Sequence, residues 1–331
     1  MDGPLVSVCI STWNRCDLLE TCINSVLKQD YQNIEIIVID NASKDHTKDY
    51  LCKLDNVRFK ILDKPESNAM ITLNMAFNAA LGKYILVLDD DAYLVDNYAI
   101  SSLVSDLENN PHAALVGANV MHYDEGKLIS QMPIRMMSGE FLSQGEVNCL
   151  GTIKHYEFHG ACALFRRNMV MEANPEGPYD NDFMIYINEF DLAGKMLNKG
   201  YEVLFDSMVL AMHVEKSATK CNVRHKYYIH NFNTCILRNF RGTFNRLKTV
   251  CIRTPMLFAF WYLRTGHLCS KFTILQMFGF TCKEFIRVII RSFKPDIYHV
   301  YPDTYMQHYL EQSMYNSFKK YSFEFMSKLV R

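Results

Sequence analysis

The sequence predicts an α/β protein built on a largely parallel sheet with helices on both faces. Four short apolar segments, at residues 5–11, 34–39, 57–62 and 84–88, alternate with segments of helical periodicity. Strands that alternate with helices are typical of βαβ units. The four segments are continuously apolar and do not alternate with polar residues, which indicates strands that are buried on both faces.

The helices are expected between these strands and beyond them. In residues 16–28 the apolar side chains recur at helical spacing, and a similar pattern ends before Gly82, a residue type that commonly follows a helix. Past residue 92 the pattern loosens, and from 223 onward it is mainly helical. The other expected helices are 44–54, 72–81, 97–109 and 189–198, and the other expected strands are 113–118, 161–166, 203–206 and 208–212.

Charge divides the chain into two parts. Residues 1–214 hold 16 Lys and Arg against 30 Asp and Glu, whereas residues 215–331 hold 19 against 6. The formal net charge of −1 therefore hides an acidic part and a basic, aromatic part. A basic second part indicates an anionic surface or partner.

The cysteines and the hydropathy indicate the compartment. Eleven scattered cysteines without a Cys-x-x-Cys pair fit reduced thiols in a cytoplasmic protein better than a disulfide framework or a structural zinc site. No basic segment followed by an apolar core opens the chain, so no signal peptide is expected. The longest apolar run, residues 255–263, is far shorter than the roughly 20 residues of a membrane-spanning helix.

Three consecutive carboxylates, Asp89, Asp90 and Asp91, follow the strand at 84–88. They repel one another, and sheet packing does not require them. A divalent cation with phosphate oxygens on its far side would use them, because hard cations prefer oxygen ligands. A solvated turn is the alternative. The position just past a buried strand, where open α/β sheets bind ligands, favours a metal and phosphate site.

Polar residues also follow the first two strands, at 11–15 and 40–45. Because the ends of parallel strands lie along one edge of a sheet, these segments are expected to converge on the three aspartates. No Gly-x-Gly-x-x-Gly follows the first strand and no Walker sequence is present, which argues against a dinucleotide oxidoreductase and a P-loop enzyme. The Asp-x-Asp-Thr arrangement of a haloacid-type phosphatase is absent as well.

Five ordered segments together resemble glycosyltransferase family 2. The family's opening strand, its Asp-Asn-x-Ser-x-Asp-x-Thr element and its Asp-x-Asp element are similar to residues 6–15 (VSVCISTWNR), 39–47 (IDNASKDHT) and 88–91 (LDDD). Its acceptor-side glycine segment and its Phe-Asp-Glu-x-Phe-Phe-x-Tyr-x-Glu-Asp-x-Asp-Leu segment resemble residues 160–167 (GACALFRR) and 178–192 (PYDNDFMIYINEFDL). The resemblance covers about residues 5–240, and among subgroups it looks most like rhamnosyltransferase-type enzymes of polysaccharide assembly.

The resemblance implies the GT-A fold of nucleotide-diphospho-sugar transferases, a Rossmann-like mixed sheet flanked by helices. Residues 1–214 would form the catalytic domain, with a nucleotide-binding half at 1–91 and an acceptor half at 92–214. Residues 215–331 would form a basic, aromatic helical C-terminal region.

A nucleotide-sugar donor is implied at the edge of the sheet. Asp40 would accept a hydrogen bond from the N3–H of uracil or thymine, and Asp89 would lie near the ribose. Asp91 would bind Mn²⁺ or Mg²⁺ that bridges the diphosphate and neutralises the leaving group. His213 would be a further metal or diphosphate contact, with a structural histidine as the alternative. The other residues implied on the donor side are Thr12, Asn14, Arg15, Asn41, Asn68 and Asp90.

The acceptor side is implied at His159, Gly160 and the start of the helix at 189–198. Glu189 would be the general base that takes the proton from the acceptor hydroxyl, which gives inversion in a single displacement. An acidic residue that merely favours the helix N-terminus is the alternative.

The chain departs from the family pattern at two places. The Glu-Asp pair of the family reads Asn188-Glu189 here, which makes Asp191 an alternative base. The Arg-Asn pair after the third strand reads Leu73-Asn74, which removes one expected cation. Lys64, Asn68 or an arginine of the C-terminal part are candidates to compensate for it.

The function expected from the resemblance is inverting, metal-dependent transfer of a sugar from a UDP- or dTDP-sugar. The acceptor would be a glycan or a lipid-linked molecule of polysaccharide or cell-envelope biosynthesis. A non-catalytic nucleotide- or glycan-binding module on the same fold is the alternative. The enzyme would be cytoplasmic.

Two interpretations fit the basic and aromatic C-terminal helices. They would dock on an anionic membrane surface, which makes the protein peripheral on the cytoplasmic face, or they would pack against the acidic domain. A homodimer interface on these helices is a further alternative. No nucleic-acid partner is expected, because no recognisable nucleic-acid-binding motif is present.

Overall fold

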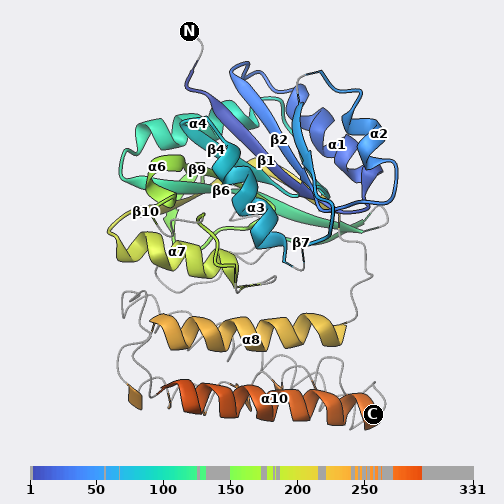
Figure 1. Cartoon of the computed structure of the whole chain (residues 1–331). Helices are drawn as coiled ribbons and strands as arrows, with labels where there is room; N and C mark the ends of the chain where they lie inside the picture. Colours follow the sequence, from blue (N-terminus) through green and yellow to red (C-terminus); the bar gives the residue numbers. More distant parts are fainter. Residues whose placement is uncertain are drawn as a thin grey trace. The chain divides into compact units, whose positions relative to one another are not determined.

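The computed structural model shows two compact units along the chain (Figure 1). Unit 1 comprises Met1–Met184 with Asn188–Ser217, and unit 2 comprises Ile185–Ile187 with Ala218–Arg331. The structure describes residues 3–55, 57–66, 68–124, 127–131, 150–172, 177–181, 183, 187–214, 221–239, 243–244, 247, 251, 254–255, 258–259, 262 and 271–292.

The sheet of unit 1 is mixed, with the strand order β3-β2-β1-β4-β9-β6-β10-β5. Its first four strands are parallel neighbours, as the sequence predicts: β1 (Val6–Thr12), β2 (Ile34–Asp40), β3 (Val57–Ile61) and β4 (Tyr84–Leu88). The other half is reached through antiparallel pairing of β9 with β4 and of β6 with β9. Its strands are β5 (Ala92–Leu94), β6 (Ala113–Asp124), β9 (Cys162–Arg166) and β10 (Glu202–Val214), with β7 (Lys127–Gln131) on β6 and β8 (Thr152–His155) on β10.

Apolar side chains are buried on both faces of the sheet. Along β1, Val6, Val8 and Ile10 belong to one buried cluster and Cys9 to the other, as the two-residue period of a strand requires. The first cluster takes in α1 (Cys16–Leu27), α2 (Thr47–Leu51) and α4 (Ala99–Asn109), and the second takes in α3 (Ala69–Ala79), α6 (Arg167–Val170) and α7 (Asn188–Asn198). Each fully buried aliphatic side chain contributes about 1.5–3 kcal/mol, so the two clusters hold the strand ends in place.

Several predicted element boundaries differ from the structure. The strand expected at 113–118 extends to Asp124 as β6. The helix expected at 44–54 is only Thr47–Leu51. The Asp45 carboxylate accepts the Thr47 N–H and hydroxyl, which holds residues 45–47 in a turn before the helix. The helix expected from 72 begins at Ala69, because the Asn68 side chain caps it by accepting the Met70 N–H at 2.9 Å. The two short strands expected at 203–212 form one strand, β10, with a register shift between Asp206 and Leu210.

Gly82 does not cap a helix, contrary to the expectation. The helix α3 ends at Ala79, and the Gly82 N–H donates to Ser7 Oγ at 2.8 Å. A Cβ on Gly82 would lie 2.7 Å from Leu5 O, Ser7 Oγ and Tyr84 O. Gly82 is therefore needed for a close approach between β1 and the start of β4.

Unit 2 is helical in its described residues, which agrees with the sequence. Its two long helices, α8 (Cys221–Asn239) and α10 (Lys271–Ser292), pack against each other. Arg287 of α10 donates to Thr234 Oγ1 of α8 at 3.1 Å, and Glu284 accepts from Arg287 at 2.9 Å. No helix in the described part of the chain is both long enough and apolar enough to cross a membrane.

We predict that Gly82→Ala destabilises the protein by about 1–3 kcal/mol, because the added methyl group cannot fit between three oxygen atoms without moving β1 or β4. Urea unfolding measures this loss. The matched control is Gly279→Ala in α10, where a Cβ meets nothing within 4 Å. Equal midpoints for Gly82→Ala and the wild type would contradict the explanation.

Candidate functional site

Three segments meet at the carboxyl ends of the parallel strands. Thr12 ends β1 and pairs in register with Asp40 at the end of β2, while the three aspartates follow β4. The Thr12 hydroxyl donates to Asp90 Oδ2 at 2.8 Å, which joins the β1 and β4 ends directly. The convergence that the sequence predicts is therefore present.

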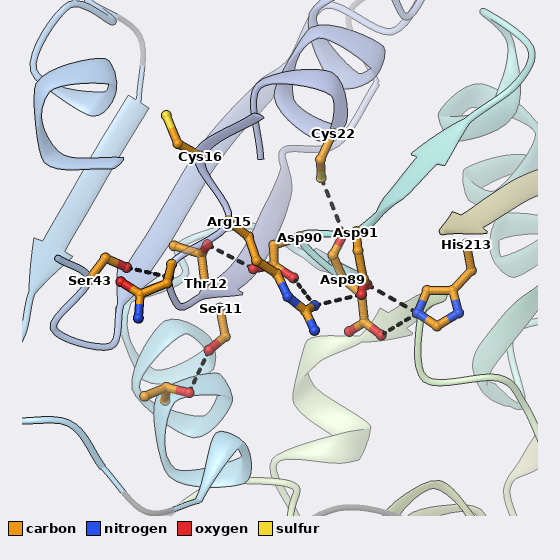
Figure 2. Close-up of polar contacts among 12 residues, drawn as sticks. Ser11, Thr12, Arg15, Cys16, Cys22, Ser43, Asp89, Asp90, Asp91 and His213 are labelled. Atoms are coloured by element: carbon orange, nitrogen blue, oxygen red, sulfur yellow. Dashed lines mark hydrogen bonds and ion pairs between the residues drawn. The ribbon is translucent and has the colours of Figure 1, made fainter. Parts of the chain in front are cut away.

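Arg15 and His213 approach the aspartates from opposite sides, as Figure 2 shows. Arg15 Nη1 lies 2.9 Å from Asp90 Oδ1 and 2.5 Å from Asp91 Oδ2. His213 Nε2 lies 3.1 Å from Asp91 Oδ1 and 3.8 Å from Asp89 Oδ2. His213 comes from β10, whose Val214 N–H donates to the Asp91 carbonyl at 2.8 Å.

Asp89, Asp91 and His213 form a cluster that can hold a metal ion. One ligand atom from each residue lies within 4.8 Å of the other two. Two carboxylates and one imidazole suit Mn²⁺ or Mg²⁺, which accept hard oxygen ligands, with nitrogen tolerated better by Mn²⁺. The family resemblance implies a place near the donor ribose for Asp89, and the structure places its carboxylate in the same cluster as Asp91.

The three carboxylates have different electrostatic surroundings. Burial raises the pKa of Asp90 to about 6, although the charge of Arg15 and the Thr12 hydroxyl oppose the increase. Burial would also raise the pKa of Asp91, but the hydrogen bond and charge of His213 and the charge of Arg15 outweigh it and lower that pKa. Asp91 is therefore the carboxylate that stays ionised most readily.

Of the three carboxylates, Asp89 has the most strongly raised pKa. Its pKa is raised to about 7, first because its carboxylate is surrounded by protein and then because Asp91 repels it. Its side chain is nevertheless 41 % exposed, so a ligand from solution can reach it. A bound cation would relieve this repulsion, because an opposite charge nearby favours the ionised form of a carboxylate.

Asp40 offers a buried oxygen atom without a partner. Its side chain is fully buried, Oδ1 accepts the Ser43 N–H at 3.0 Å, and Oδ2 has no hydrogen-bond partner among the described residues. An unsatisfied buried carboxylate oxygen is costly, which favours a donor group supplied by a ligand. The contact with the base N3–H that the resemblance implies for Asp40 stays a prediction.

The loops after β1 and β2 lock each other in place. Asn14 has φ 53° and Ala42 has φ 60°, so both residues adopt the left-handed conformation. The Asn14 N–H donates to Ser43 Oγ at 2.8 Å, and Asn14 Oδ1 accepts the Lys44 N–H at 2.6 Å. Asn14 therefore shapes the loops through its backbone N–H and its side-chain oxygen.

Asn41 and Asn68, both predicted on the donor side, also hold backbone segments. Asn41 Nδ2 donates to the Glu66 carbonyl at 3.0 Å, and its Oδ1 accepts the Glu66 N–H at 2.6 Å. Asn68 caps α3 with Oδ1 and donates from Nδ2 to the Asn181 carbonyl at 2.6 Å. Asn74, where the family carries the asparagine of its Arg-Asn pair, donates to the Tyr179 carbonyl at 2.7 Å. Asn68 and Asn74 therefore connect α3 to residues 179–181.

Glu189 and Asp191, the two candidate bases, differ in what surrounds them. Asp191 is 3 % exposed and forms a 2.6 Å ion pair with Lys195, which is 2 % exposed, one turn further along α7. This buried ion pair neutralises the charge of Asp191. Burial raises the pKa of Glu189 to about 7, which suits a group that takes up a proton near neutral pH. The surroundings therefore favour Glu189 as the base.

Gly160 lies directly against the Glu189 side chain. A Cβ at Gly160 would overlap Glu189 Oε1 and would lie 3.1 Å from Cγ and Cδ. The neighbouring residue, His159, accepts the Ala161 N–H at Nδ1 over 3.1 Å. The pKa of His159 is lowered to about 3, first by burial and then by His122 and His213, so its imidazole is neutral.

His122 belongs to the site, although the sequence analysis does not single it out. Its Nδ1 lies 3.2 Å from His213 Nδ1, and its ring centroid lies 5.1 Å from those of His159 and His213. The strand expected from the sequence ends at residue 118, whereas β6 extends to Asp124, so no local signal points to His122. Only the pairing of β6 with β10 brings it there.

Comparison with known proteins identifies the relatives of this chain. Residues 7–173 match the family described as glycosyl transferase family 2. An uncharacterized glycosyltransferase of Haemophilus influenzae is 28 % identical over 194 residues, which are 55 % of this chain and 59 % of that protein. The O-antigen chain rhamnosyltransferase RfbN of Salmonella typhimurium is 25 % identical over 72 % of this chain and 76 % of its own length.

The fold has a counterpart among solved structures. The mannosyltransferase PcManGT of Pyrobaculum calidifontis, solved in complex with GDP-Man and Mn²⁺, superposes with a TM-score of 0.54 at 16 % identity. The superposition covers 98 % of this chain and 87 % of that one. It confirms the GT-A fold class predicted from the sequence. The chain spans less than two thirds of the Haemophilus influenzae relative.

Proposed function

Since the chain belongs to glycosyl transferase family 2, we propose that it is an inverting, metal-dependent glycosyltransferase. It moves a sugar from a UDP- or dTDP-sugar to a glycan or lipid-linked acceptor in polysaccharide or cell-envelope biosynthesis. The observation that carries this proposal is the cluster of Asp89, Asp91 and His213 at the sheet edge. The rhamnosyltransferase among its relatives supports the choice of pathway.

The donor nucleotide binds along the ends of β1 and β2. The unpartnered Oδ2 of Asp40 accepts the pyrimidine N3–H, a role that its burial and the lack of a partner among the described groups support. Arg15, whose side chain is 45 % exposed, offers guanidinium donors that can turn from the aspartates to the diphosphate. Thr12 keeps Asp90 in place through its 2.8 Å hydrogen bond.

Asp91, His213 and Asp89 would hold Mn²⁺ or Mg²⁺. When bound there, the ion supplies a Lewis acid that neutralises the charge developing on the leaving nucleoside diphosphate. The Mn²⁺ in the PcManGT complex supports this choice of ion. The low pKa of Asp91 keeps that ligand ionised at neutral pH.

Glu189 is the general base of the transfer. It takes the proton of the acceptor hydroxyl as that oxygen forms a bond to the anomeric carbon of the sugar. The bond from the anomeric carbon to the diphosphate oxygen breaks in the same step, and the nucleoside diphosphate leaves with the electron pair. Attack from the face opposite to the leaving group inverts the anomeric configuration.

The C-terminal part carries exposed apolar side chains and an excess of basic residues. Four apolar side chains of α10 are more than half exposed and recur at helical spacing: Leu275, Phe278, Ile286 and Ile290. Together with the excess of basic residues in 215–331, they favour an anionic membrane surface as partner. The membrane, the homodimer and the cytoplasmic location stay predictions.

We predict that Asp91→Ala lowers turnover of the nucleotide-sugar donor by about 10²-fold or more, because the site loses its most acidic carboxylate. Release of nucleoside diphosphate in the presence of Mn²⁺ measures it. The matched control is Asp55→Ala, which removes an exposed aspartate before β3. Wild-type turnover in Asp91→Ala would show that the aspartate cluster is not the donor site.

Glu189→Gln is expected to lower kcat by about 10²–10⁴-fold, because the amide keeps the shape of the side chain but cannot take a proton. Donor binding should stay unchanged. In the wild type, kcat should rise with pH through about 7, since the base works in its ionised form and its pKa is raised to about 7.

Steady-state kinetics over the pH range measures the loss of kcat in Glu189→Gln and the pH dependence of the wild type. The control is Glu20→Gln, on the exposed side of α1. Full activity of Glu189→Gln would reject Glu189 as the base. A wild type that binds donor tightly but shows no transfer to any acceptor would favour the non-catalytic module.

Gly160→Ala is expected to reduce kcat by about 10²-fold while the donor KM stays within about twofold. The methyl group would overlap the Glu189 carboxylate and displace the base, and a displacement of about 1 Å costs this much. Gly279→Ala, in open space on α10, is the control. An unchanged kcat in Gly160→Ala would show that Gly160 does not position the base.

A further inference from the structure

We propose that His122 is a positioning residue that orients His213 and thereby sets the affinity of the Asp89, Asp91 and His213 cluster for a divalent cation. This inference rests on the proposed function, because it takes His213 as a ligand of that cation. It adds a residue that no segment of the family resemblance includes.

The backbone holds the two imidazoles side by side. The strands β6 and β10 are parallel neighbours, and His122 pairs directly with His213 in their register. Directly paired residues of neighbouring strands project to the same face of the sheet. The two rings meet edge to face, with an angle of 78° between their planes and with Nδ1 of each 3.2 Å from Nδ1 of the other.

The Nδ1 contact determines which nitrogen of His213 can bind a cation. His213 directs Nε2 at Asp91 and Asp89, so Nε2 is the nitrogen that faces the cluster. A ligating Nε2 carries no proton, and the proton of the neutral ring then resides on Nδ1 and needs an acceptor. His122 Nδ1 is within hydrogen-bonding distance of that N–H and can accept it through its lone pair.

His159 fixes the other side of His122. Its ring centroid lies 5.1 Å from that of His122 and 5.8 Å from that of His213, so the three imidazoles form a triangle. His159 is itself anchored, because its Nδ1 accepts the Ala161 N–H at 3.1 Å. His122 is therefore in ring contact with an anchored imidazole on one side and the cluster imidazole on the other.

Partners of this kind tune metal sites. The second nitrogen of a metal-binding histidine almost always donates to a carboxylate, a carbonyl or water, and loss of that partner costs about 10–100-fold in metal affinity. In this chain the partner would be another imidazole. A purely packing role for His122 is the competing explanation, and it predicts that ring volume rather than an acceptor atom matters.

Two variants of the full-length chain separate these explanations. His122→Phe keeps an aromatic ring but removes the acceptor, and His122→Asn removes the ring but retains an amide oxygen that can replace Nδ1 as acceptor. The probe is Mn²⁺ alone, with binding followed through the electron paramagnetic resonance signal of the free ion. We expect His122→Phe to weaken Mn²⁺ binding about 10–100-fold and His122→Asn to stay within about threefold of the wild type.

Wild-type affinity in His122→Phe, or an equal loss in both variants, would overturn the role of His122 while the donor site stands. A wild type that binds no Mn²⁺ by itself overturns the inference too, and turnover of Asp91→Ala then judges the proposed function separately. If His122→Phe does not fold, ¹⁵N spectra of the wild-type histidines decide, because the proposal requires a ¹⁵N–¹⁵N coupling across a hydrogen bond from His213 Nδ1–H to His122 Nδ1 when Mg²⁺ is bound, and absence of that coupling would overturn it.

Discussion

Repulsion among the three adjacent carboxylates after β4 is the constraint on which the rest of the site depends. Two unit charges about 4 Å apart repel each other by roughly 4 kcal/mol at the effective dielectric of a protein surface. Arg15, Thr12 and His213 come from three different elements to offset that repulsion. The pKa of Asp89 is nevertheless raised to about 7, first by burial and then by repulsion from Asp91. A site built this way is prepared for a cation, because a cation removes the remaining cost.

The mixed sheet explains why these groups can meet. The parallel half places the ends of β1, β2 and β4 along one edge, where a donor and its diphosphate would bind. The other half, joined through β9, brings His213 and His122 beside each other on β10 and β6. Glu189 lies in the first turn of α7 next to Gly160, so the candidate base comes from the same half as the histidines.

Local patterns predict the parallel half well and the second half only in part. Asp40 and Asp89–Asp91 are visible in the sequence because each follows a continuous apolar strand, and parallel strands place such ends together. The pairing of His122 with His213 depends on the register of two strands about 90 residues apart, and no local sequence pattern predicts that register. The fit of Gly160 against Glu189 likewise arises only when α7 packs on the sheet. At Gly82 a local pattern misleads. It suggests the end of a helix, whereas the residue allows β1 and the start of β4 to approach each other closely.

The most direct test of the account is a thermal-shift panel of UDP, dTDP, GDP and their sugar conjugates, with and without Mn²⁺. A ligand that binds only the folded state raises the melting temperature through mass action. The account predicts a shift with a UDP or dTDP compound that requires Mn²⁺ and disappears in Asp91→Ala. A nucleotide shift of equal size without Mn²⁺, or one that survives in Asp91→Ala, would contradict the central role of the aspartate and histidine cluster.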